Sequence, residues 1–210
     1  MPRLVFDRQL NELYQLVFEL SEITRQHFVE SYAAYVKKDI SLAEKSIASD
    51  VEVNKLYEQL DQKAIQMISQ QQPVATDLRK IIGVIKIATD IERIADFAVN
   101  MSRASIYLNS NNSVKINQDI DKMYESMMKM FNDTFTAFMN NDKKLAQKVI
   151  EFDDVMDEHF ITIINNIKEL NKEEHLIEEC LQLGFMARYL ERTADHLTNI
   201  AENIIYIQRK

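Results

Sequence analysis

Apolar residues recur near the start of the chain at alternating spacings of four and three, the period of a helix face that packs against other helices. The repeating positions are Phe6, Leu10, Leu13, Val17, Leu20 and Thr24. The pattern continues without a helix-breaking residue up to the polar run 37–39, and it predicts a helix over residues 4–36.

Two further helices are expected in the first half of the chain. Ser41, with Glu44 three residues later, is typical of a capping box and predicts that the second helix begins at Ser41. This helix should end near residue 70, because proline disfavours the helical conformation in the residue before it and Pro73 follows. Pro73 should stand just before the third helix or within its first turn, and this helix should continue to about residue 108.

A polar run at residues 109–113, Asn-Ser-Asn-Asn-Ser, predicts a linker at the midpoint. Beyond it, the pattern predicts helices over residues 117–140, 142–170 and 173–208. We therefore expect an all-α fold of six long helices, arranged as two tandem, pseudo-symmetric three-helix bundles. The first domain should span residues 1–110 and the second residues 114–210.

An internal duplication relates the two halves. Residues 92–107 (ERIADFAVNMSRASIY) and 191–206 (ERTADHLTNIAENIIY) are 99 positions apart and identical at seven of sixteen positions, where unrelated sequences would match at about one. Residues 39–54 and 142–157, which are 103 positions apart, match at six of sixteen. The difference between the two offsets indicates that the second half lacks four residues at the bend before its last helix.

Acidic residues accompany the duplicated pattern. The third helix of each half has small or apolar residues in the same phase, from Val84 to Ser105 and from Leu183 to Ile204, and acids directly follow two of these positions in each copy. Residues four apart lie on one face of a helix. The second and third helices of both halves thus carry four such pairs: Asp50 with Asn54, Glu92 with Asp96, Asp153 with Asp157, and Glu191 with Asp195.

Composition excludes several classes of protein. Two glycines and two prolines are too few for the turns of a sheet protein. A net charge of -8 with scattered lysine and arginine argues against nucleic-acid binding. The most apolar stretch, residues 81–91, contains Lys86 and cannot cross a bilayer core of about 30 Å. A single cysteine, Cys180, and a charged N-terminus that does not resemble a signal peptide favour the cytoplasm.

Carboxylates four residues apart repel each other, and either a bound cation or a neighbouring arginine must offset this repulsion. Arg93 and Arg192 are suitable arginines, and a single acid pair is most simply explained by such ion pairs, since about five pairs would arise by chance. Pairs at matching places of both halves favour metal sites instead. Ligands that are all oxygen suit Mg, Mn or Fe, and do not suit a thiolate zinc site.

Catalytic machinery is not evident. The sequence contains no P-loop, no GxGxxG and no Ser-His-Asp order. A di-metal carboxylate enzyme built on a helical bundle is the main alternative, but none of the histidines (His27, His159, His175 and His196) completes the Glu-x-x-His ligand pair of such enzymes. A histidine phosphotransfer bundle would require an exposed His196. We therefore expect a protein that is not an enzyme.

The chain resembles the bacterial PhoU family over nearly its whole length. The resemblance rests on PVATDLRKIIGVIKIATDIERIADFAVN from Pro73 and LGFMARYLERTADHLTNIAENIIY from Leu183, with an ERxxD core in both copies. It implies a cytoplasmic, dimeric negative regulator of the phosphate-starvation response that connects the ATPase subunit of the Pst phosphate transporter to a PhoR-type sensor kinase.

The resemblance also implies metal ions at the eight paired positions: clusters of iron or zinc, or single Mg or Mn ions. Asn54 departs from the acidic pattern of the family. Its amide oxygen can coordinate a metal but brings no charge, so the first-half site should bind metal more weakly than the second. Arg93 and Arg192 are expected to orient the carboxylates or to balance their charge.

Overall fold

The computed structural model describes residues 2–110, 117–170 and 176–208, and these residues are almost entirely helical. The helices are α1 (Pro2–Lys37), α2 (Ile40–Gln71), α3 (Ala75–Ser110), α4 (Asn117–Asn140), α5 (Lys143–Glu151), α6 (Asp153–Leu170) and α7 (Ile177–Ile207). The predicted all-α fold is confirmed. Most of the predicted linker 109–113 and the predicted start of the last helix at residue 173 lie outside the described residues.

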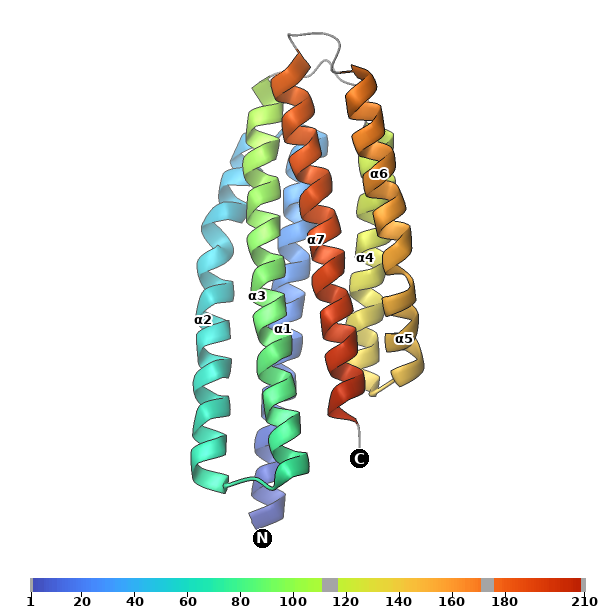
Figure 1. Ribbon diagram of the computed structural model, residues 1–210. Helices are drawn as coiled ribbons and strands as arrows, with labels where there is room; N and C mark the ends of the chain where they lie inside the picture. The colour runs from blue at the N-terminus through green and yellow to red at the C-terminus, as the bar shows by residue number, and fades with distance from the viewer. Residues whose placement is uncertain (1, 111–116, 171–175, 209–210) are drawn as a thin grey trace.

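The helices form two groups that meet along α3 and α7. Helices α1, α2 and α3 pack on one another, and α7 packs on α4, α5 and α6. Figure 1 shows α3 and α7 side by side through the middle of the molecule, and their contact is the most extensive between any two helices. The division into domains 1–110 and 114–210 stays a prediction, because packing alone does not show that each half folds by itself.

The core contains the residues that the hydrophobic pattern selects. Every repeating position on α1 from Phe6 to Thr24 is buried, and so is every matching position on α3 and α7. The acids that follow these positions are consequently drawn toward the core. Glu92 and Asp96 on α3, and Glu191 and Asp195 on α7, are partly buried.

The predicted capping box at Ser41 is wrong. Helix α2 begins one residue earlier, at Ile40, because the Asp39 carboxylate accepts a hydrogen bond of 3.0 Å from the Leu42 amide. A carboxylate is a favourable N-cap, since it satisfies an amide that lacks a partner within the helix. Asp142, the counterpart of Asp39 in the duplication, caps α5 in the same way through the amide of Leu145 at 3.1 Å.

The predicted helix over residues 142–170 is interrupted at Phe152. The Phe152 amide hydrogen-bonds to the carbonyl oxygens of both Lys148 and Val149, and the Val155 amide bonds to the Phe152 carbonyl oxygen. The bonds between Phe152 and Val149 and between Val155 and Phe152 span three residues and tighten the helical turn, which separates α5 from α6. Asp153, one of the predicted metal ligands, therefore begins a new helix, where the N-terminal dipole favours a negative charge.

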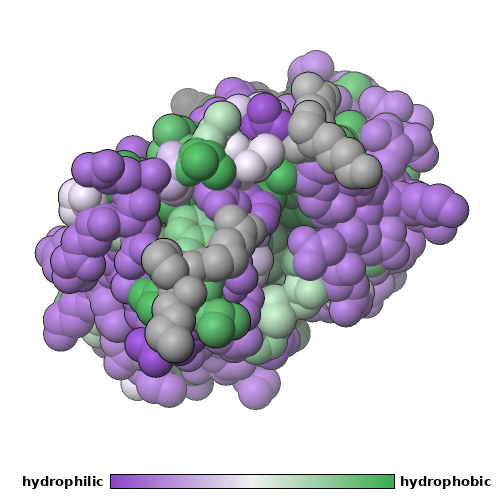
Figure 2. Space-filling view, turned by 90° about the horizontal axis from the view of Figure 1, so that it is seen from below, coloured by the Kyte–Doolittle hydropathy of each residue, from purple (hydrophilic) through white to green (hydrophobic). Residues whose placement is uncertain are grey.

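The end of the molecule that carries the bend between α2 and α3 is mostly polar at its periphery, as Figure 2 shows. Among the described residues, no helix has both the length and the apolar character needed to cross a membrane.

Candidate functional site

The first group of acids lies where α2 packs on α3. Burial raises the pKa of Glu92, and the negative charges of Asp96 on the same helix and Asp50 on α2 raise it further, while Arg93 opposes this shift. The acids that the sequence pairs on two separate helices therefore lie within electrostatic range of each other. Asn54 is also present, and its side-chain amide donates a 2.9 Å hydrogen bond to Asp50 Oδ2.

The second group lies at the matching place between α6 and α7. Burial raises the pKa of Glu191, and Asp195 and Asp157 add to the shift. Burial also raises the pKa of Asp153, with further contributions from Asp195, Asp157 and Asp154. Asp157 and Asp195 thus act on both Glu191 and Asp153, which brings the four predicted residues of this half into one acidic group. Asp154 belongs to the same acidic environment, although the sequence pairing did not select it.

Arginines lie against both groups of acids. Arg93 Nη1 is 3.4 Å from Asp96 Oδ2, and Arg192 Nη1 is 2.9 Å from Asp195 Oδ2. Arg188 Nη1, which the duplication does not predict because the first half has Thr89 at this place, is 2.8 Å from Glu191 Oε1. The structure therefore contains the arginine pairing that the sequence offered as the alternative to a cation.

The second group nevertheless has an oxygen that the arginines leave unsatisfied. Glu191 Oε2 is buried and accepts no hydrogen bond, and Arg192 Nε lies 3.8 Å away, beyond hydrogen-bonding distance. An ionised carboxylate oxygen without a partner is costly away from water. The carboxylate oxygens of the second group are therefore suitable ligands for a hard cation. The first group fits less well, because Asn54 already provides a donor to Asp50.

The side chains as they stand do not form a closed coordination sphere. Among the residues that the structure describes, no three His, Cys, Asp or Glu side chains are grouped so that they could hold a metal ion. Metal binding at the eight predicted positions accordingly stays a proposal. It would require the carboxylates to turn away from the arginines and toward each other.

The histidines form structural contacts. His196 Nδ1 on α7 lies 2.8 Å from Asp90 Oδ1 on α3, its ring lies beside Phe97, and 24% of its side chain is exposed. It therefore joins the two halves, which does not fit the exposed phosphate acceptor of a phosphotransfer bundle. His27 and His159 each bond a serine hydroxyl, that of Ser49 and that of Ser126. His175 lies outside the described residues.

Fold and site together define a duplicated helical protein with carboxylate clusters at equivalent places in its two halves. The PhoU domain matches residues 7–105 and 120–204, which is most of the chain and follows the duplication. The chain belongs to the PhoU family.

Curated relatives are similar in sequence to this chain over most of its length. The phosphate-specific transport system accessory protein PhoU homolog of Clostridium acetobutylicum is 30% identical over 209 residues, which cover 99% of this chain and 95% of the relative. The Aquifex aeolicus protein of the same description is 33% identical over 186 residues, 88% of this chain and 84% of the relative. Both are named as accessory proteins. Neither relative is named as an enzyme.

Solved structures show the same fold. The crystal structure of PhoU from Pseudomonas aeruginosa superposes with a TM-score of 0.92 at 26% identity, covering 96% of this chain and 98% of that one. The phosphate transport system regulatory protein PhoU from Streptococcus pneumoniae superposes with a TM-score of 0.90 at 24% identity, covering 97% and 96%. The arrangement of two bundles along α3 and α7 is therefore that of solved PhoU proteins.

Proposed function

We propose that this protein is an accessory regulator of phosphate-specific transport that limits the phosphate-starvation response in the cytoplasm. The observation that carries the proposal is the match of both halves to the PhoU domain, together with relatives that are named accessory proteins of phosphate-specific transport. In this role the protein is an adaptor. Its partners are the ATPase subunit of a Pst-type transporter and a PhoR-type sensor kinase, and it acts as a homodimer.

The adaptor is proposed to bind metal at the two acidic groups. Asp153, Asp157, Glu191 and Asp195 would hold an ion of Fe, Zn, Mn or Mg in the second half. Such an ion supplies positive charge that neutralises the clustered carboxylates and cross-links the helices that carry them. The unsatisfied Glu191 Oε2 supports this assignment.

The corresponding first-half set is Asp50, Asn54, Glu92 and Asp96. Because one of these four brings no charge, the first-half set should bind an ion more weakly than the second-half set. An ion between α2 and α3, or between α6 and α7, would hold the two helices together. Partner binding could thereby depend on metal through the shape of the helical surface.

The regulatory role is tested by deleting the gene in its own host and measuring starvation-gene expression in rich phosphate. We expect high expression, restored to a low level by the wild-type gene. Low expression in the deletion strain would contradict the regulatory role.

A second arm separates metal binding from regulation. The strain is complemented with a variant that carries Asp153→Asn, Asp157→Asn, Glu191→Gln and Asp195→Asn, and the metal content of both purified proteins is measured. If the variant lacks metal but still represses, the regulatory proposal stands and the metal-dependent part is wrong.

A further inference from the structure

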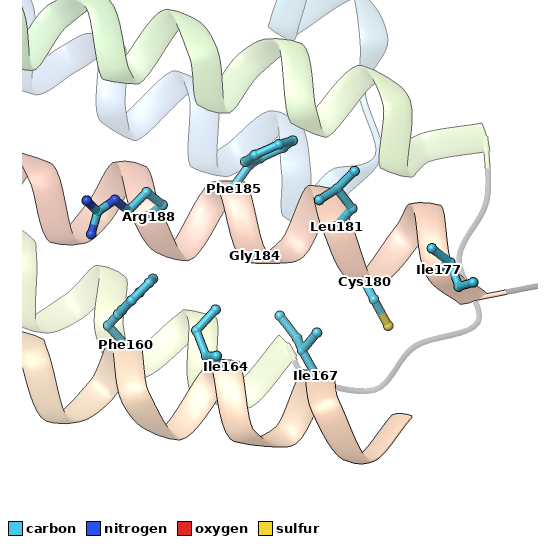
Figure 3. A pocket seen from close by; sticks show the side chains of 9 residues that line it. All are labelled: Phe160, Ile164, Ile167, Ile177, Cys180, Leu181, Gly184, Phe185 and Arg188. Carbon is cyan, nitrogen blue, oxygen red and sulfur yellow. The ribbon is translucent and has the colours of Figure 1, made fainter. Parts of the chain in front are cut away.

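An apolar pocket of about 370 Å³ opens between α6 and α7 (Figure 3). Phe160, Ile164 and Ile167 of α6 point across it toward α7, and the Cys180 side chain of α7 points back toward α6. Of the nine lining residues in the part of the chain that the structure describes, Arg188 is the only charged one. The pocket is thus apolar along its length, with the guanidinium of the Arg188–Glu191 ion pair at one end.

Part of this apolar lining is exposed to solvent. Leu181 is 52% exposed, Ile177 45% and Phe185 41%, and all three lie along the same side of α7. Neighbouring large apolar side chains in water are unfavourable and commonly mark a binding site. The exposure therefore indicates that something covers this pocket when the protein functions.

One residue that lines the pocket differs in size between the two halves of the duplication. At the offset of 99, Gly184 corresponds to Ile85, which packs against the core of the first half. A side chain at Gly184 would have room, since a Cβ there comes no closer than 3.6 Å to Ile167 Cδ1. The pocket therefore exists partly because glycine replaces a large apolar residue at this position.

The residues at the charged end differ between the halves as well. In the first half, Tyr57 and Thr89 bond to each other, with their hydroxyl oxygens 3.3 Å apart. Their counterparts at the offsets of 103 and 99 are Phe160 and Arg188. The Arg188 guanidinium lies 5.7 Å from the centre of the Phe160 ring, so the second half presents a cation where the first half has a closed hydroxyl pair.

We propose that this pocket binds a free single-chain carboxylate, such as a medium-chain fatty acid, with the chain between α6 and α7 and the carboxylate on Arg188. The volume lies within the range of about 300–1,000 Å³ that is typical of small-ligand sites lined by apolar groups with few polar ones. A guanidinium has five N–H donors, and the one to Glu191 leaves others for a second carboxylate.

Two other occupants fit the observations less well. A stable protein interface takes about 20–30 residues from each side, of which the described lining of this pocket supplies nine. An acyl chain still held in an anionic bilayer would have to approach a protein whose net charge is -8, which is unfavourable. A soluble ligand with one negative charge avoids both difficulties.

The test uses the full-length protein with octanoate, decanoate and dodecanoate, each below its micelle concentration, and isoleucine methyl NMR to locate binding. We expect saturable binding that shifts the Ile164, Ile167 and Ile177 methyl signals and leaves that of Ile65 on α2 unchanged. Because each buried methylene contributes about fourfold in affinity, two further methylenes should tighten binding by about 16-fold. Uncharged 1-decanol should bind at least tenfold more weakly than decanoate.

Two variants and one control locate the site. Gly184→Ile should remove binding by filling the pocket with the residue type of the first half. Arg188→Gln should weaken decanoate at least tenfold and leave 1-decanol unchanged, which keeps the proposal testable if Gly184→Ile fails to fold. Ile161→Ala, at an exposed position of α6 outside the pocket, should bind like wild type.

Several outcomes would overturn the proposal. These are the absence of saturable binding, equal affinities for decanoate and 1-decanol, and unchanged binding by both Gly184→Ile and Arg188→Gln. Binding to phosphatidylglycerol vesicles without binding of the free acids would assign the pocket to a membrane instead. A dimer that Gly184→Ile dissociates in sedimentation velocity would identify a second copy of the chain as the occupant. The proposal does not depend on the transport role, so either can fail alone.

Discussion

Gly83 of α3 lies directly against Ile207 of α7, and a Cβ added to Gly83 would come 2.3 Å from Ile207 Cγ1. This contact belongs to the helix pair that joins the two halves of the molecule. Because glycine has no side chain, the end of α7 can approach α3 more closely at Gly83 than any other residue would permit.

Replacing Gly83 with alanine should destabilise the protein despite the better helix propensity of alanine. Overpacking costs about 1–3 kcal/mol and the gain in propensity offsets about 1 kcal/mol, so we expect a net loss of about 1 kcal/mol in the free energy of unfolding. Urea denaturation measures this change. Ile207→Ala in the same chain should remove most of the penalty of Gly83→Ala, and equal penalties in both backgrounds would contradict the contact.

Gly184 provides the matched control, because it is the other glycine of the chain and lies within a helix with room around it. Gly184→Ala should raise the free energy of unfolding by up to about 1 kcal/mol. Denaturation of both alanine variants under the same conditions checks the opposite signs. A loss of stability in both would show that the difference in surroundings has no effect.

The acidic group between α6 and α7 should make the metal-free protein more stable as the pH falls. Burial and neighbouring acids raise the pKa of Glu191 above its ordinary value, so the folded state binds the proton more tightly than the unfolded state. The contribution of Glu191 to the free energy of unfolding is thus fully present below the ordinary glutamate pKa of about 4.3 and is lost as the pH rises through the folded pKa.

Thermal unfolding in the presence of a chelator measures this dependence. Glu191→Gln should raise the unfolding temperature at pH 7 and reduce its increase toward pH 5. Glu202→Gln, at an exposed position of the same helix, should leave the pH dependence unchanged. An identical pH dependence in wild type and Glu191→Gln would show that the carboxylates do not interact as described.

Asn54→Asp should strengthen metal binding in the first half. The substitution removes the amide donor 2.9 Å from Asp50 Oδ2 and adds the charge that the matching pair of the second half has. Competition with a chelating dye should show wild type filling its second-half site first and the variant filling both at similar concentrations. In chelator, Asn54→Asp should instead lower the unfolding temperature at pH 7, because like charges four residues apart repel. Unaltered first-half affinity would contradict the assignment of Asn54.

Three buried serines form a polar contact inside the first bundle. Ser31 Oγ on α1 lies 2.7 Å from Ser102 Oγ and 3.2 Å from Ser46 Oγ, and it donates a 2.8 Å bond to the Ala98 carbonyl oxygen. Ser31→Ala should cost about 1–3 kcal/mol because it leaves buried polar groups without a partner. Ser31→Ala combined with Ser102→Ala should cost less than the sum of the single changes in urea denaturation. Strict additivity would contradict a shared contact.

The repeating pattern of apolar residues determined most of the fold. Positions such as Val84 and Leu183 are buried as their spacing requires, because a helix of 3.6 residues per turn must turn a four-three pattern toward one side. The same spacing placed Glu92 and Glu191 at the edge of the core. These conclusions depend only on the spacing of residues along a helix, which can be read from the sequence.

The exact positions where helices begin and end were harder to predict from sequence. Ser41 and Asp39 are both good caps, and only the backbone course shows that Asp39 begins the helix. The interruption at Phe152 has no glycine or proline to mark it, since a change from four-residue to three-residue hydrogen bonds leaves no sequence signal.

Tertiary structure alone decided how side chains from distant helices meet. The pairing of His196 with Asp90 and the pocket beside Gly184 both join residues on different helices. Sequence spacing fixes which side of a helix a residue occupies, but the approach of two helices and the choice of side-chain partners depend on the packing of the whole chain. The duplication therefore predicted two equivalent acidic groups, whereas packing made the second one deeper, less satisfied and adjacent to an apolar pocket.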